Sequence, residues 1–219
     1  MPVVRRLPWS LVSVVITASA AAVGACSNTP SGPSGTRVDT VQAATPYTGT
    51  MTNNFGVTNF SGFSEIEVGD VDATNPGQTD RGAVTFNVIT FEGDTVQSAV
   101  LRLDECNVQG TPFASLGNVI VDGIAPGTPP GNTQFMGAPL ATYDTLATST
   151  TTGFLYDTVT SSVATAITDS ATYAQFRLRF TGQAGNSNDT TDLVSFRSNE
   201  TGFCPGDSTR APILILTLH

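Results

Sequence analysis

Two stretches near the C-terminus alternate apolar and polar side chains with a period of two residues. In YAQFRLRF, residues 173–180, the apolar side chains take every second position, and Gln175, Arg177 and Arg179 lie between them. LVSFRS, residues 193–198, repeats this pattern. A period of two is typical of a strand with one face in a core and the other in water. Because a loop rich in Gly, Asn and Asp joins the two stretches, we predict an antiparallel hairpin whose Phe side chains face the core.

The rest of the chain reads as short strands separated by turn residues. Alternation is clear in residues 81–89 and 96–103, and the tight turn predicted between them makes these two strands neighbours. PILILTL, residues 212–218, is typical of a strand covered on both faces. A helix is predicted from Thr160 or Ser161 through Ile167, and residues 125–139 read as a long surface loop. The pattern predicts an all-β fold, a two-sheet jelly-roll-like sandwich with one short helix.

The first 26 residues have the layout of an export signal. Two arginines near the start precede an apolar stretch, Leu11–Val23, that is too short to cross a bilayer comfortably. The segment ends in VGAC, and this resembles a bacterial lipoprotein signal with its lipobox. The resemblance implies removal of residues 1–25 and acylation of Cys26, which attaches the protein to a membrane through a lipid anchor. An ordinary secretory leader with an incidental cysteine is the alternative.

The residues after the signal predict a tether. Residues 26–46 are rich in Ser, Thr, Gly and Pro, which bury too little apolar surface to offset the entropy of ordering, so we predict a flexible linker. The folded β-sandwich domain is then expected over residues 47–219. Ser rather than Asp at position 27 favours the outer membrane under the sorting rule of some Gram-negative lipoproteins. We therefore expect a bacterial outer-membrane or cell-surface location.

Cysteine and charge content narrow the possibilities further. With Cys26 assigned to lipid, Cys106 and Cys204 remain in an oxidising compartment, and we predict a disulfide between them. The chain has no Lys, and its net charge of -9 falls by two, to -11, when the leader with its two arginines is removed. Nucleic acid is excluded as a partner, because phosphate binding needs a basic surface.

The sequence offers few side chains that could form a catalytic site. The single histidine is His219, the last residue, so a Ser-His-Asp or Cys-His site would need the chain terminus. Gly206-Asp207-Ser208 matches the core of the GDS hydrolases but lacks a partner histidine, and we interpret it as a turn. A pair of carboxylates for glycoside hydrolysis stays open among the eighteen acids. The prediction is a protein that is not an enzyme.

Five segments, in a fixed order, carry a family resemblance. They are RGAVTFNV, SAVLRL, ASLGNVIVD, AQFRLRF with NDTTDLVSF, and APILILTL, between Glu65 and His219. As an ordered set they resemble the DNRLRE-type modules of bacterial surface proteins, related to the family 96 carbohydrate-binding modules. The resemblance implies a β-sandwich that binds polysaccharide or serves as a non-catalytic surface module, often with calcium. We expect a cell-surface lipoprotein displaying such a carbohydrate-binding or adhesion module. The alternatives are a structural envelope protein without a specific glycan ligand and a polysaccharide-active enzyme.

Two sets of residues are candidates for ligands. The loop Asn186–Asp192 alternates oxygen donors and resembles the calcium-type loops of relatives, which makes Asp189 and Asp192 candidates for a structural Ca²⁺, with a plain Asx-rich turn as the alternative. Arg177, Arg179 and Arg197 project opposite the Phe side chains and could form a patch for an acidic polysaccharide. The alternative is cross-strand ion pairing, or stems covered by a loop.

Overall fold

The computed structural model describes residues 35–54, 57–62, 65–71, 77–182, 190–198, 204 and 208–219. The strands in these ranges are β1 (Arg37–Gln42), β2 (Gly49–Asn54), β3 (Val57–Gly62), β4 (Ile66–Val71), β5 (Gln78–Asn87), β6 (Val96–Gln109), β7 (Val119–Ile124), β8 (Ala141–Ala147), β9 (Gly153–Thr158), β10 (Tyr173–Phe180), β11 (Asp192–Phe196) and β12 (Ile213–Leu218). The helices are α1 (Pro112–Ser115), α2 (Asn132–Met136) and α3 (Thr160–Thr168), with short 3-10 turns η1 (Thr45–Tyr47), η2 (Ile89–Phe91) and η3 (Ser208–Arg210).

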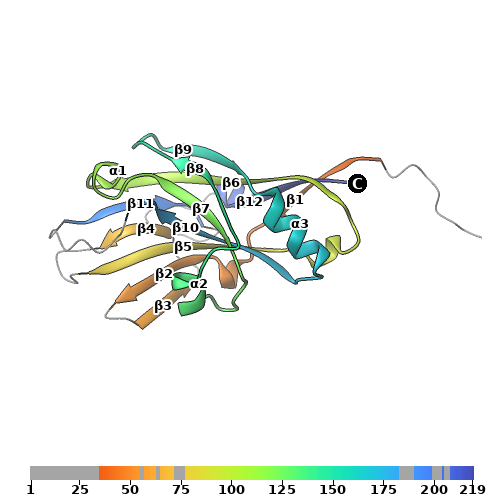
Figure 1. Ribbon diagram of the computed structural model, residues 1–219. Coiled ribbons are helices and arrows are strands. Elements are labelled where there is room, and N and C mark those ends of the chain that lie inside the picture. Colours follow the sequence, from red (N-terminus) through yellow and green to blue (C-terminus); the bar gives the residue numbers. More distant parts are fainter. Residues whose placement is uncertain are drawn as a thin grey trace, which may run out of the picture. The chain divides into compact units, whose positions relative to one another are not determined.

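The strands form an all-β sandwich with antiparallel pairing throughout (Figure 1). One layer has the order β3–β2–β5–β10–β7–β8. In the other layer β6 pairs with β9 along one edge and with β12 and then β11 along the opposite edge, while β1 lies outside β12 and β4 outside β11. β4 also pairs with the start of β5, so backbone hydrogen bonds continue from one layer to the other at this edge. The predicted fold class is confirmed.

A hydrophobic core fills the space between the layers. From β10 it receives the alternate residues Ala174, Phe176, Leu178 and Phe180, as the period-two pattern predicts. The facing layer contributes apolar side chains of β6, β11 and β12, namely Ala99, Leu101, Leu103, Val194, Phe196, Leu214, Leu216 and Leu218. The rings of Phe86 and Phe176 meet edge to face with centroids 6.2 Å apart, an arrangement that aromatic pairs favour.

The predicted hairpin is wrong, although its core face is right. β10 pairs with β5 and β7, whereas β11 pairs with β4 and β6. The two strands therefore belong to different layers, and both of their edges are occupied by other partners. The prediction that β5 and β6 are neighbouring strands is also wrong, because they lie in different layers. Alternation specifies which face of a strand is buried, but it does not specify which strand lies beside it.

Several element boundaries also differ from expectation. α3 confirms the predicted helix, with Val163 and Ile167 buried in the core, but α1 and α2 were not predicted. β12 is covered on one face only, since Ile213, Ile215 and Thr217 are half-buried on the outer side. The six residues of β1 lie within the predicted linker but belong to the fold, because β1 pairs with β12 over its whole length. A short polar strand of this kind carries little hydrophobic signal.

Cys106 and Cys204 form a disulfide, with Cα atoms 5.9 Å apart and a sequence separation of 98 residues. Cys106 lies on β6, and Cys204 belongs to the connection between β11 and β12. A cross-link over so long a loop lowers the entropy of the unfolded chain. Cys26 lies outside the described residues, so its lipidation stays a prediction.

Replacing both disulfide cysteines by serine is expected to lower the free energy of unfolding by about 2–5 kcal/mol, because the unfolded chain regains the entropy of the closed loop. Urea unfolding of the oxidised protein, the reduced protein and the double variant measures this. The reduced protein should match the variant. A variant as stable as the oxidised protein would contradict the role of the bridge.

Candidate functional site

The outer face of the first layer carries a buried carboxylate shared by two arginines. Asp122 lies on β7 directly opposite Arg177 of β10, and Arg179 lies two residues further along. Arg177 donates to Asp122 Oδ2 through Nη2 at 2.6 Å and through Nε at 3.1 Å, and Arg179 Nε donates to the same oxygen at 2.7 Å. Thr142 Oγ1 of β8 donates to Oδ1 at 2.8 Å. Asp122 therefore joins three neighbouring strands.

The protonation state of Asp122 follows from these contacts. Burial alone would raise its pKa, since a low-dielectric surrounding disfavours the charged form. The hydrogen bonds from Arg179, Arg177 and Thr142 outweigh burial and hold the pKa of Asp122 below its ordinary value. The carboxylate stays ionised at neutral pH.

A loop with a short helix covers this part of the sheet, and Arg177 holds it in place. The Nη1 group of Arg177 donates to the backbone carbonyls of Gln134, Phe135 and Gly137, at 3.1, 2.9 and 2.9 Å. These carbonyls lie at the end of α2, where helix carbonyls lack intrahelical partners and a cation is favoured. Arg177 is only 3% exposed as a result. For Arg177, therefore, both alternatives weighed in the sequence, cross-strand pairing and a covered stem, describe the geometry.

Gln175 fixes the start of the same loop. Its amide oxygen accepts from the backbone N–H of Gly127 at 3.0 Å, and its Nε2 donates to the carbonyl of Gly127 at 3.3 Å and to Thr85 Oγ1 at 2.6 Å. A Cβ on Gly127 would lie 2.4 Å from the end of the Gln134 side chain, so a larger residue there would displace Gln134. The polar positions of β10 thus anchor residues 125–140 on the sheet.

A third arginine completes the cluster. Arg81 projects from β5, stacks its guanidinium over the ring of Phe135 at 4.4 Å and donates to the carbonyl of that residue. Burial lowers the pKa of Arg81 to about 10, and the charges of Arg177 and Arg179 act in the same direction. Within the described part of the chain, no carboxylate forms an ion pair with Arg81. Three guanidinium groups therefore surround one carboxylate, an excess of positive charge in an acidic protein.

These arginines border a hollow of about 460 Å³, which we call the arginine hollow. Its lining combines Asn53, Thr79 and the three arginines on the sheet side with residues 135–139 of the covering loop and residues 180–182 at one end. Arg179 remains 25% exposed there. Asp80 lines a small adjoining recess together with Arg81 and Arg179. Burial raises the pKa of Asp80 to about 6, so this carboxyl is still mostly ionised at neutral pH and adds a second negative charge near the arginines. The size falls in the range of small-molecule sites.

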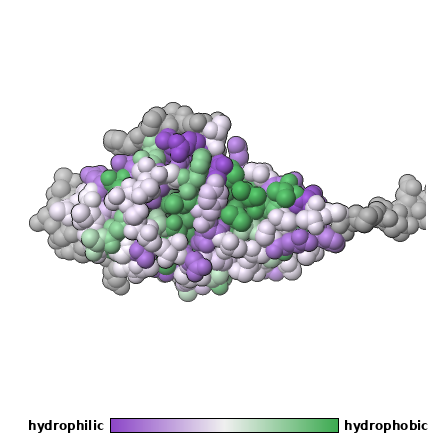
Figure 2. Space-filling view, turned by 90° about the horizontal axis from the view of Figure 1, so that it is seen from above, coloured by the Kyte–Doolittle hydropathy of each residue, from purple (hydrophilic) through white to green (hydrophobic). Residues whose placement is uncertain are grey.

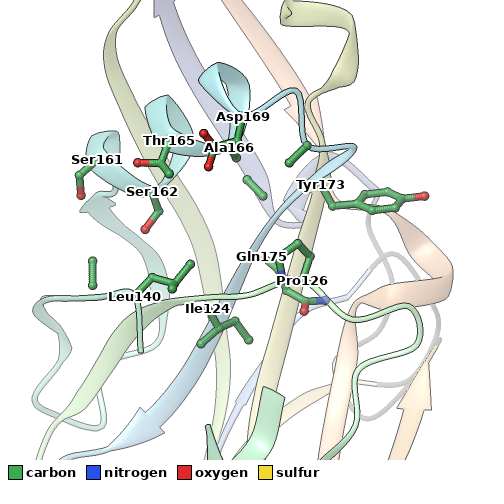
Figure 3. A pocket seen from close by; sticks show the side chains of 13 residues that line it. Ile124, Pro126, Leu140, Ser161, Ser162, Thr165, Ala166, Asp169, Tyr173 and Gln175 are labelled. Carbon is green, nitrogen blue, oxygen red and sulfur yellow. The ribbon is translucent and has the colours of Figure 1, made fainter. Parts of the chain in front are cut away.

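A second pocket lies at the other end of the covering loop (Figure 3). Ser161, Ser162 and Thr165 of α3 project toward it, and Ile124 and Leu140 face them from the opposite side. Ser161 and Ser162 are hydrogen-bonded to the hydroxyl of Tyr143, at 2.8 and 2.6 Å. The pocket measures about 180 Å³, smaller than typical ligand sites, and arginine does not line it. The arginine hollow is the stronger candidate.

The structure separates the remaining predicted site residues. Arg197 follows β11 in the other layer and pairs with Asp104, so Arg177, Arg179 and Arg197 do not form one patch. Asp189 lies outside the described residues. Asp192 is buried, and its Oδ1 accepts from the backbone N–H of Thr111 at 2.6 Å. In the ranges described, His, Cys, Asp and Glu do not form a group of three suited to a metal, and calcium binding stays a prediction.

Two members of the cluster were missed in the sequence. Asp122 interrupts the apolar run VIVDGI, and an acid in a buried strand signals a charged partner. Arg81 begins the alternating run of β5, but the sequence around it does not indicate that Arg177 and Arg179 lie nearby. Both belong to the site only because β5, β10 and β7 are adjacent in the sheet. No protein-family model and no curated protein matches this chain.

Asp122→Asn is expected to lower the free energy of unfolding by about 3–5 kcal/mol, because it leaves the buried guanidinium of Arg177 without a counter-charge. Asp39→Asn is the matched control, since the Arg37–Asp39 pair is exposed and its loss should change stability far less than the loss of Asp122. Denaturant unfolding of both variants measures the difference. Equal losses would contradict a structural role for Asp122.

The pH dependence of stability has a defined sign. Burial raises the pKa of Glu67 and of Glu105 to about 7, and that of Asp80 and of Asp157 to about 6. The ordinary values are about 4, so between about pH 4 and 7 the folded state holds more protons than the unfolded state. Stability should therefore fall as pH rises through this window.

Urea unfolding at pH 5 and pH 8 measures the effect, with the lower stability expected at pH 8. Glu105→Gln should flatten the profile, because it removes one of the groups that must ionise while buried. Below about pH 4 the lowered pKa of Asp122 adds a loss of the opposite sign. Equal stability at pH 5 and pH 8 would contradict the assignment of these buried acids.

Proposed function

We propose that this protein is a lipid-anchored cell-surface protein whose sandwich is a non-catalytic module that binds acidic polysaccharide in the arginine hollow. The observation that carries the proposal is the cluster of Arg81, Arg177 and Arg179, in which Arg177 and Arg179 share the carboxylate of Asp122 and Arg81 forms no ion pair within the described ranges. An anionic ligand would supply the missing counter-charge. The planar guanidinium matches the carboxylate of a uronic acid, because two parallel N–H groups can donate to its two oxygens.

The three arginines have different parts in this proposal. Arg177 contributes charge from below the surface, since its donors are used by Asp122 and the covering loop. Arg179 and Arg81 are the residues that would contact the ligand, because both line the hollow and are less buried than Arg177. Arg179 also donates to both oxygens of Asp122 and to the carbonyl of Phe180, so a ligand would use the N–H groups that these bonds leave over. Asn53 and Thr79 add polar atoms that could pair with sugar hydroxyls.

The cell-surface part of the proposal rests on the leader and its Cys26. Within the described ranges, the helices are all too short and too polar to cross a membrane. A non-catalytic role agrees with the lone terminal histidine and with the use of Asp122 in ion pairs. The outer-membrane location and the lipid anchor are part of the same proposal.

A structural envelope protein without a glycan ligand is the second candidate. It is favoured by the contacts of Arg177, which are fully explained by holding residues 125–140 on the sheet. In that case the hollow would be a by-product of the covering loop. Binding measurements separate the two candidates.

Wild-type protein is expected to be retained on immobilised polygalacturonate and to pass through a neutral dextran matrix. Arg81→Gln/Arg179→Gln should weaken retention at the hollow at least about tenfold, because each charge-assisted hydrogen bond contributes roughly 1.5–3 kcal/mol. Arg37→Gln is the matched control, since Arg37 is an exposed arginine on β1 that pairs with Asp39 and Asp94. Circular dichroism and thermal unfolding establish that each variant is folded.

The same experiment carries two further arms. Chelator and added Ca²⁺ test whether the ion contributes to retention. Release of unsaturated or reducing sugars from the matrix would contradict the non-catalytic assignment. Wild-type protein that is not retained by polygalacturonate would contradict the proposed ligand class and favour the structural candidate.

A further inference from the structure

A second arginine cluster on the opposite layer repeats the design of the first. Asp104 of β6 is fully buried and accepts from Arg197 Nε and, at 2.7 Å, from Arg210 Nη2. Arg102 lies two residues before Asp104 on the same outer face, since Leu101 and Leu103 point into the core. Six arginines of the chain thus gather in two clusters, each around one buried aspartate.

Arg102 is the member of this cluster without a carboxylate in the described ranges. Its Nη2 donates to the backbone carbonyl of Thr209 at 3.0 Å, and its guanidinium stacks on the ring of Phe154 at 4.6 Å. Arg210 stacks on the same ring at 4.9 Å. The Nε groups of Arg102 and Arg210 are buried and lack an acceptor in the described structure. Being buried, these two groups cannot contact a ligand directly, but they leave positive charge without an acceptor beneath this surface.

Exposed aromatic side chains lie directly beside these arginines. The register places Tyr156 of β9 and Ile213 of β12 on either side of Arg102, and Phe154 opposite Asp104. Tyr156 is 57% exposed and Phe154 is 42% exposed. Figure 2 looks down on the edge of the sandwich that carries β8 and β9 in Figure 1, and hydrophobic surface gathers along the middle of this edge. We call Arg102, Phe154, Tyr156 and Arg210 the β9 platform.

We propose that the β9 platform is a second binding surface for a chain of uronic-acid sugars. The apolar C–H face of a pyranose ring would stack on the free ring of Tyr156, and the carboxylate of the same or the next sugar would accept from Arg102. The strands β9, β6 and β12 beneath are antiparallel neighbours, so an extended sugar chain can lie across them. The ligand class rests on the proposed function, but the platform shares no residue with the arginine hollow.

Charge argues against a second copy of this chain as the occupant. A symmetric contact through the platform would bring Arg102 and Arg210 against the same residues of the partner, and like charges at a desolvated contact are costly. An acidic glycan meets the excess positive charge instead. Because the two layers face opposite ways, one molecule with both sites could hold two glycan chains.

Isotope-labelled protein titrated with hexagalacturonate tests the platform directly. The ring signals of Tyr156 are expected to shift and saturate. Tyr156→Ala should weaken binding at this site about tenfold, whereas Tyr156→Phe, which keeps the ring, should change it less than about twofold. Arg102→Gln should also weaken binding, and Arg37→Gln, on the same layer, should not. Tyr156 is exposed, so its replacement leaves the fold intact.

The outcomes separate the platform from the arginine hollow. Arg81→Gln/Arg179→Gln should keep the Tyr156 shifts and lose one of two binding equivalents in calorimetry. If Tyr156→Ala removes all binding, the hollow is contradicted and the platform stands. The platform is overturned if the Tyr156 signals stay unchanged while the protein binds, or if Tyr156→Ala binds like wild type. Self-association in sedimentation that Tyr156→Ala abolishes would also overturn it.

Discussion

The buried carboxylate of Asp122 is the contact on which the outer face of the first layer depends. A charge without water is stable only when it is paired and hydrogen-bonded, and Asp122 meets this condition with two arginines and a threonine from the strands on either side. Arg177 connects this ion pair to the covering loop, because its remaining N–H groups donate to the carbonyls of that loop. The walls of the arginine hollow therefore derive from an ion pair beneath them.

Asp104 on the opposite layer is also a buried carboxylate paired with two arginines, but the surface above it has a different shape. Around Asp122 the arginines are roofed by residues 125–140, and a hollow remains. Around Asp104 the arginines stack on Phe154, and the face next to them stays open and aromatic. In an acidic chain without lysine, six of the seven arginines after residue 26 lie at these two places. Acidic glycans would be directed to these two places by charge.

The candidate site could be predicted only in part. The sequence placed Arg177 and Arg179 on the outer face of their strand, because parity along a strand is a local property. It grouped Arg197 with them on the assumption of a hairpin, and Arg197 instead pairs with Asp104 in the other layer. Arg81, Asp122 and Asp104 were not recognised as partners. Asp122 and Asp104 lie 55 to 106 residues away in the sequence from the arginines that they pair with, and a single sequence does not show which distant residues come together.

The sequence by itself determined the all-β class, the core face of the strands that alternate apolar and polar residues, the helix at residues 160–168 and the Cys106–Cys204 bridge. These follow from local periodicity and from the count of cysteines. Only the tertiary structure decided that β10 and β11 lie in different layers and that β1 belongs to the fold. It also decided that one loop covers the surface beside three arginines. The reason is that strand pairing is made by backbone groups common to almost all residues, so neighbours are chosen by the packing of the whole sandwich.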